Sequence, residues 1–247
     1  MGLSDSLAEL NHQRFQGFED QNSYRAAWLF DGPSFKKLNV HDFSNDEIKK
    51  LDGQLCILSG LYGILKATDA IQPYRLEMGC RLDVDGAKNL YQFWEKHELT
   101  SELASLANGK CIVNCASQEY SKVINFDELR KEGVQIIDIV FQGNNGRLAS
   151  VFAKQARGLF CRFVAKADPS SLEDLQSFTG DGHYVFKEQS GEKLIFERHA
   201  TPKSAGDEVL WGGQQEAPKK KKGSTKKKQD KIATTKRTAS KVKRSKN

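Results

Sequence analysis

Lys154 and Arg157 are two cations that lie where a helix normally favours anions. Apolar residues repeat at helical spacing over residues 153–167, which predicts a helix with both cations in its first turn, beside its apolar stripe. Positive charge at that end opposes the helix dipole, unless the free backbone N–H groups there hold an anion. Two interpretations are open: an anion-binding site, or two side chains that reach only water or an acidic neighbour.

A second group of polar residues follows a short apolar stretch at residues 110–116, which predicts a buried strand. Asn114 lies near its end, and Ser117 opens a predicted helix that also carries Glu119 and Tyr120. Side chains at such strand-to-helix junctions gather in one crevice, the usual ligand site of α/β proteins. We expect this group to face the two cations above. Alternatively, Ser117 and Glu119 are only capping residues.

The stretch LSGLYGILKATDAIQPYRLEMG, residues 58–79, also leaves an apolar strand but follows neither helical nor strand periodicity for long. Pro73 stiffens its second half, so Tyr74, Arg75 and Glu77 would be presented from a rigid loop. We predict that this irregular segment forms one wall of an anion-binding crevice. The alternative for Arg75 and Glu77 is a structural ion pair that ties the loop down.

Sequence motifs for other chemistries are absent. The sequence has no GxxxxGK[ST] phosphate loop, no GxGxxG, no GxSxG and no HExxH, and its five histidines lack metal-ligand spacing. Cys111 and Cys115 are close in sequence, and their even spacing on one strand face favours a packing role. These observations predict neither a metal site nor a cofactor.

Charge divides the chain of 247 residues into two parts. Residues 219–247 contain 14 of the 38 Lys and Arg but one of the 32 Asp and Glu, so residues 1–218 are acidic overall. The lysine-rich part has almost no large apolar residues, and we expect a disordered tail at 203–247 after a domain at 1–202. Lysine blocks attract polyanions and match nuclear-import patterns, although such a tail also serves as a solubilising extension.

Signals for membranes and secretion are absent as well. No stretch approaches the roughly 20 apolar residues of a membrane-spanning helix, and the N-terminal residues lack the pattern of a secretory signal. Five cysteines, an odd number, fit reduced thiols better than a disulfide framework. We therefore expect a soluble, cytoplasmic protein without a membrane partner, or a nuclear one if the tail at 219–247 acts as an import signal.

The apolar patterns predict a mixed α/β fold, a single compact domain in which helices flank a sheet that is part parallel and part antiparallel. Predicted helices cover residues 4–14, 22–30, 89–106 and 153–167, and further helices start after Ser44, Ser117 and Ser170. Predicted strands cover residues 54–58, 110–116, 134–141, 147–152, 184–187 and 193–197.

Several longer stretches together resemble one known family. LSGLYGIL, QPYRLEMG, LYQFW, VNCASQEY and FAKQARGLFCRF occur in this order, and over residues 3–199 the chain is similar to the YaaA family of peroxide stress proteins, formerly a domain of unknown function. The resemblance implies an α/β domain of unusual fold with a positively charged cleft that binds double-stranded DNA. It also implies protection during hydrogen peroxide stress, associated with limited intracellular free iron.

The same resemblance implies a helix-hairpin-helix element, whose second helix would correspond to GLSDSLAELNHQRF near the N-terminus. Family members carry some tens of residues, with a strand that reads like Ile-Ser-Pro-Ala-Lys, before the point at which this chain begins. Without that segment we expect only half of the motif and an exposed sheet edge. The basic tail is also outside the family pattern, and would add affinity for phosphates without sequence specificity.

We predict that the protein contacts DNA phosphates through the side chains of a local groove. The predicted groove residues are Arg14, Lys66, Tyr74, Arg75, Arg81, Asn114, Ser117, Tyr120, Lys154, Arg157 and Arg162. The alternative is an enzyme acting on a phosphorylated or nucleic-acid substrate, with Glu77 or Glu119 as general acid or base and cations as anion clamps. The sequence offers no clustered ligands for iron, so control of iron would be indirect.

Overall fold

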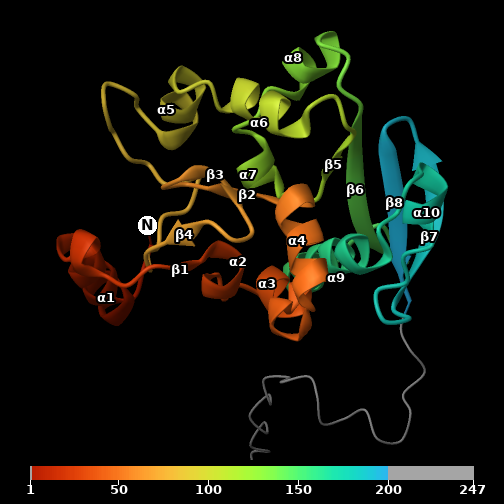
Figure 1. Cartoon of the computed structure of the whole chain (residues 1–247), viewed down its shortest axis with the longest axis horizontal. Helices are drawn as coiled ribbons and strands as arrows, with labels where there is room; N and C mark the ends of the chain where they lie inside the picture. Colours follow the sequence, from red (N-terminus) through yellow and green to blue (C-terminus); the bar gives the residue numbers. More distant parts are fainter. Residues whose placement is uncertain (1, 200–247) are drawn as a thin grey trace, which may run out of the picture. The chain divides into compact units, whose positions relative to one another are not determined.

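A four-stranded mixed sheet organises the second half of the chain (Figure 1). The computed structural model describes residues 2–199, so the tail predicted at 203–247 lies outside the described residues. β5 and β8 both run parallel to β6, whereas β7 is antiparallel to β8, and the predicted mixture of strand directions is confirmed. The strands, in the spatial order β5-β6-β8-β7, are β5 (Ile112–Asn114), β6 (Ile136–Gly143), β8 (Lys193–Arg198) and β7 (Tyr184–Ser190).

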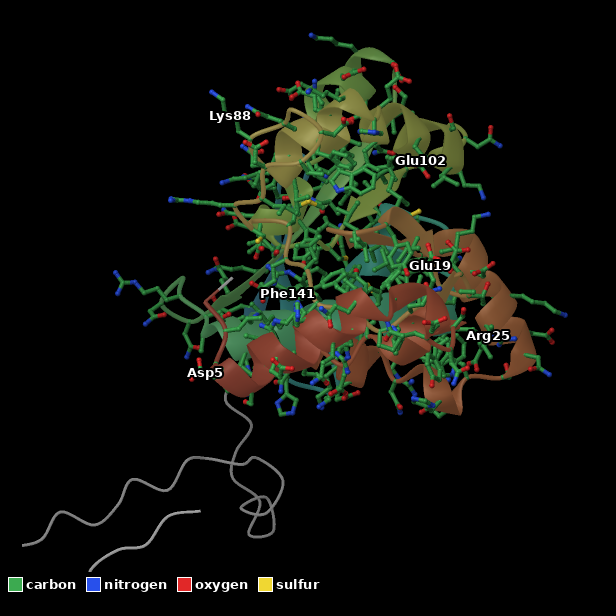
Figure 2. All side chains as sticks on the ribbon, turned by 90° about the vertical axis from the view of Figure 1, so that its left-hand side faces the viewer. Asp5, Glu19, Arg25, Lys88, Glu102 and Phe141 are labelled. Atoms are coloured by element: carbon green, nitrogen blue, oxygen red, sulfur yellow. The ribbon has the colours of Figure 1, made fainter. Side chains whose placement is uncertain are left out.

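The long helix α9 (Ser150–Ala167) follows β6 and packs against the sheet through aromatic side chains. Phe160 is fully buried, and its ring centroid lies 5.0 Å from that of Phe178 and 5.7 Å from that of Phe196. Phe141 of β6, labelled in Figure 2, joins the cluster at 6.2 Å from Phe160 and is partly buried. Such edge-to-face aromatic packing holds α9 on the sheet.

The side of α9 away from this cluster is covered by α3 (Pro33–Leu38) and by α4 (Asn45–Gln54). α3 approaches so closely that a Cβ at Gly158 would collide with the backbone oxygen of Ser34. The glycine is therefore a requirement of this helix–helix contact, since every other residue type carries a Cβ. Phe30 and Phe35 stack at 4.8 Å in the adjoining core.

The N-terminal region consists of short helices and two small antiparallel sheets. Its helical elements are α1 (Asp5–Gln16), η1 (Phe18–Asp20), α2 (Ala26–Leu29) and, after α3, η2 (Val40–Asp42). The paired strands are β1 (Tyr24–Arg25) with β4 (Ala70–Ile71), and β2 (Cys56–Ser59) with β3 (Gly63–Lys66). α1 lies where the second helix of the predicted motif is expected, and the helix-hairpin-helix element itself remains a prediction.

Helix starts predicted from capping residues agree well with the structure. α4 begins with a capping box, in which Ser44 and Glu47 each accept a hydrogen bond from the other's backbone N–H. The helix predicted after Ser170 is α10 (Leu172–Gln176), which starts one residue later and has a second capping box between Ser171 and Asp174. Side-chain caps thus fix these boundaries.

The prediction of one long helix over residues 89–106 is wrong. Glu98 adopts a left-handed backbone conformation with φ 53° and separates two helices. The break lets Trp94 and Leu99 converge on Gly63, where a Cβ would lie 2.8 Å from a side-chain atom of each. The helices of this region are α5 (Leu90–Lys96), α6 (Leu99–Ala107), α7 (Gln118–Ser121) and α8 (Phe126–Lys131).

Three further predictions need correction. The strand predicted at 147–152 is absent, because α9 begins at Ser150. Lys154 and Arg157 are therefore the fifth and eighth residues of α9 and do not lie in its first turn. The helix predicted at 22–30 is reduced to α2, and β1 takes its first half.

The segment 58–79 is only partly irregular, since β3 and β4 lie within it. The positive φ of Gly63 allows the chain to turn back, so that β3 pairs with β2. Residues 72–79 are the part that remains without regular structure. None of the helices described between residues 2 and 199 is long and apolar enough to cross a bilayer.

Candidate functional site

The irregular segment 72–79 is held in place by α1. Asn11 is buried, and its side chain donates to the Arg75 carbonyl and accepts from the Arg75 N–H, each over 3.0 Å. An amide paired in this way satisfies both polar groups of one backbone unit, as a neighbouring strand would. The position of Arg75 is therefore set by a residue 64 positions earlier in the chain.

The other side of segment 72–79 lies on the turn between β2 and β3. A Cβ at Gly60 would lie 2.6 Å from the Leu76 carbonyl oxygen, so glycine is required for this approach. The Gly60 carbonyl accepts a hydrogen bond from Trp94 Nε1 over 3.1 Å. The segment is consequently fixed from two sides although it is neither helix nor strand.

Tyrosines fill the space between segment 72–79 and this turn. The Tyr74 hydroxyl lies 2.5 Å from Ser59 Oγ, and the rings of Tyr74 and Tyr62 meet edge to face at 5.5 Å. Tyr62 donates to Gln72 Oε1 over 2.6 Å. Burial raises the pKa of Tyr74 to about 12, so this hydroxyl stays protonated at neutral pH. Tyr74 thus provides a neutral, amphipathic side chain between segment 72–79 and this turn, and it is no general base.

Segment 72–79 also meets α7. Glu119 Oε1 accepts a hydrogen bond from the Gly79 N–H over 3.0 Å. Burial raises the pKa of Tyr120, and the negative charges of Glu119 and Glu77 act in the same direction, because both carboxylates lie near this hydroxyl. Two of the three segments predicted to form the crevice therefore lie side by side.

The capping alternative for α7 is wrong. Ser117 occupies the N-cap position, but its hydroxyl makes no capping hydrogen bond, and Glu119 bonds outside its own helix. Asn114 donates to Asp138 Oδ1 of β6 over 2.8 Å, and its own oxygen accepts from the Ala116 N–H. Asn114 therefore shapes the strand exit, while Ser117 is left partly exposed beside it.

Arg75 and Glu77 form the ion pair that the sequence offered as the structural alternative, with 2.6 Å between Nη2 and Oε1. Their side chains are 44% and 47% exposed, so the pair contributes little to stability. A phosphate that binds Arg75 has to compete with Glu77. A catalytic role for Glu77 would equally require this pair to open.

We expect Asn11→Ala to lower the free energy of unfolding by about 2 kcal/mol, because it leaves the N–H and carbonyl of Arg75 without their partners. Urea denaturation measures this loss, and hydrogen exchange should show residues 72–79 opening first. The exposed neighbour His12 provides the control, and His12→Ala should change stability by less than about 0.5 kcal/mol. Equal effects of the two substitutions would contradict the anchoring role of Asn11.

The three predicted cations of α9 differ in their surroundings. Lys154 is exposed. Burial lowers the pKa of Arg157, and its Nε is shielded from solvent without a hydrogen-bond partner in the described part of the chain. Arg162 binds Asp42 through two hydrogen bonds of 2.6 and 2.7 Å and also donates to the Leu38 carbonyl. Arg162 therefore joins α9 to η2, a structural role that the sequence analysis did not foresee.

The remaining predicted cations lie on separate elements. Arg14 belongs to α1, Lys66 ends β3, and Arg81 follows segment 72–79. Within residues 2–199, none of these three side chains is in an ion pair with a carboxylate, and no hydrogen bond or ion pair joins Arg75 to α9. The convergence of all three strand exits in one groove stays a prediction. Over the same residues, no group of three His, Cys, Asp or Glu side chains is arranged to hold a metal ion.

Two arginines that the sequence analysis missed line an open surface hollow of about 480 Å³ near the start of α9. They are Arg147 and Arg198, and the Arg198 guanidinium lies 4.0 Å from the centroid of the Phe152 ring. The first turn of α9 has no acidic residue, and its N-cap, Ala149, has no side-chain cap. The positive end of the helix dipole thus adds to the charge of two guanidinium groups. The sequence pattern predicts a strand at residues 147–152, so the start of α9 and the arginines near it were not predicted as a site.

Comparison with known proteins places the chain in a family. A family model described as peroxide stress protein YaaA matches residues 1–190. The chain belongs to this family. A relative named UPF0246 protein, from Legionella pneumophila, is 36% identical over 202 residues, which cover 79% of each chain. Another of that name, from Aliivibrio fischeri, is 38% identical over 214 residues, 82% of this chain and 81% of the relative. The family description supports a role in peroxide stress.

Proposed function

We propose that the protein acts in peroxide stress by binding DNA through its phosphates, with the start of α9 as the principal contact. The observation that carries this proposal is the open hollow lined by Arg147 and Arg198 at a helix end without acidic residues. Guanidinium groups match the geometry of phosphate oxygens, and the end of the helix adds favourable charge. Lys154, exposed on the next turn, extends the same positive region.

The contact is local, because residues 1–218 are acidic overall. A broad basic surface is not required, since each phosphate needs one or two cations in position. Tyr74 and Tyr120, which burial keeps protonated, would provide neutral walls along which the backbone of a nucleic acid passes. Arg75 would join the contact after releasing Glu77.

The salt dependence of DNA binding by residues 1–202 tests this function. If Arg147, Arg198 and Lys154 each contact one phosphate, log Kobs should fall against log salt with a slope of roughly −3, or about −0.9 per contact. Fluorescence anisotropy with a labelled duplex gives this slope. A negligible affinity at about 0.1 M salt, with no slope, would contradict the proposal.

The same salt titration is repeated with the full chain. It carries 14 further Lys and Arg over residues 219–247, so its affinity and its slope should both exceed those of residues 1–202. If only the full chain binds, the tail is the DNA-binding part and the α9 region is not. The two sources of affinity are therefore separated by one experiment.

The family resemblance also implies limited free iron. DNA binding does not itself lower the iron concentration, but it displaces Fe²⁺ from the DNA. Cations condense around DNA, and a protein that covers phosphates releases them. A released Fe²⁺ ion no longer reacts with hydrogen peroxide next to the DNA. This account requires no iron site in the protein, and it fails together with DNA binding in the titration above.

A further inference from the structure

Cys115 and Cys161 bring two thiols together from distant parts of the chain. Cys115 follows β5 directly, and Cys161 lies in the middle of α9. Their thiols lie close enough together that each shifts the pKa of the other. Each residue is partly exposed. Cys115 packs against the aromatic cluster between α9 and the sheet, and Cys161 packs against the core cluster that contains Leu38 of α3, so the pair lies between two core clusters. The packing role that the even spacing of Cys111 and Cys115 favoured does not account for the pairing of Cys115 with Cys161.

Arg157 stands next to the two thiols. It precedes Cys161 by one helical turn, and its buried Nε has no partner among the described residues. Its positive charge favours the thiolate form of Cys115, whereas the neighbouring Cys161 thiol and burial raise the Cys115 pKa. The Cys115 thiol in turn lowers the pKa of Cys161. A thiolate in the pair thus has an S–H donor and a guanidinium close by, as reactive cysteines have.

We propose that Cys115 and Cys161 are a redox-active pair that hydrogen peroxide converts into an intramolecular disulfide. The bond would tie the exit of β5 to the middle of α9. The inference rests on the contact between the two thiols and on the unpartnered guanidinium beside them. It is independent of DNA binding by the protein.

The reaction proceeds in two balanced steps. The Cys161 thiolate attacks one oxygen of hydrogen peroxide, the O–O bond breaks, and the released hydroxide takes up a proton to give water and a sulfenic acid. The Cys115 sulfur then attacks the Cys161 sulfur, and the S–O bond breaks. The departing hydroxide takes the Cys115 proton as a second water. Two thiols are oxidised to one disulfide while one peroxide is reduced to two waters.

The other cysteines provide internal controls. Cys56 and Cys111 are exposed as whole residues. Their thiol groups are nevertheless partly shielded from solvent, which raises the pKa of each thiol. No other thiol lies in contact with either of them within residues 2–199. Because reaction with peroxide needs the thiolate, these two should react more slowly than Cys161, by about tenfold.

The test uses the full, reduced chain treated with an equimolar amount of hydrogen peroxide. Free thiols are then blocked with N-ethylmaleimide, and the peptides are mapped without reduction. We expect a Cys115–Cys161 cross-linked peptide, a mass loss of two hydrogen atoms in the intact chain, and full reversal by dithiothreitol. A cross-link between two copies, or oxidation of Cys56 or Cys111 before the pair, would overturn the inference.

Single substitutions assign the two roles. Cys115→Ser should stop the reaction at a sulfenic acid on Cys161, which dimedone traps, and Cys161→Ser should prevent both the trap and the disulfide. Cys111→Ser, at the other end of the same strand, is the matched control and should form the disulfide at the unchanged rate. A disulfide that forms only after unfolding in urea would show that the native contact has no such chemistry, and the proposal would fall.

Discussion

Gly158→Ala is expected to lower the free energy of unfolding by about 3 kcal/mol. The added methyl group would collide with the backbone oxygen of Ser34, which cannot rotate away as a side chain can. α3 would have to move off α9, and the core around Leu38 and Phe35 would loosen with it. Urea denaturation followed by circular dichroism measures the loss.

Gly53→Ala is the matched control for this substitution. Gly53 also lies inside a helix, α4, but a Cβ there meets no atom within 4 Å. Alanine has the higher helix propensity, so this variant should be more stable than the parent by about 0.5 to 1 kcal/mol. If both variants changed stability in the same direction and by similar amounts, the close contact between α3 and α9 would be contradicted.

Reversing the charge of Arg147 and Lys154 together, as Arg147→Glu and Lys154→Glu, is expected to weaken DNA binding by residues 1–202 roughly a hundredfold near 0.1 M salt. Both side chains lie at the start of α9, and neither is in an ion pair with a described carboxylate. Each lost phosphate contact should also reduce the salt slope by about 1. Anisotropy titrations at several salt concentrations measure both quantities.

The control variant changes the net charge by the same amount as the charge reversal above, but at residues away from the start of α9. Lys110→Glu and Lys131→Glu alter two exposed lysines, one before β5 and one at the end of α8. If binding depends on the α9 region, this pair should weaken it by less than about threefold through general repulsion. Equal losses in the two double variants would show that binding depends on overall charge and not on this site.

Local signals account for the parts of the fold that could be predicted. Ser44 followed by Asp46 and Glu47 marks a helix start through interactions within one turn, and the structure has it there. The apolar stripe of residues 153–167 likewise predicts the body of α9. Its true start at Ser150 could not be predicted from the sequence, because Ala149 at the N-cap position carries no capping side chain.

Non-local contacts account for most of what was missed. The break at Glu98 makes sense once Trp94 and Leu99 are seen to pack together on Gly63, some thirty residues away. Arg162 and Asp42 are 120 positions apart, so the sequence shows a free cation where the fold has a bidentate pair. The types of the site residues could be read from the sequence, whereas their partners could not.

The position of β8 in the sheet has a consequence for biosynthesis. It is the last strand described, yet it lies between β6 and β7, and Phe196 on it completes the aromatic cluster under α9. While the ribosome has not passed Arg198, β6 lacks one of its neighbours, and β7 lacks the one neighbour that it has among residues 2–199. The apolar faces of β6 and α9 therefore stay partly uncovered until β8 has been synthesised, and folding of this sheet can be completed only then.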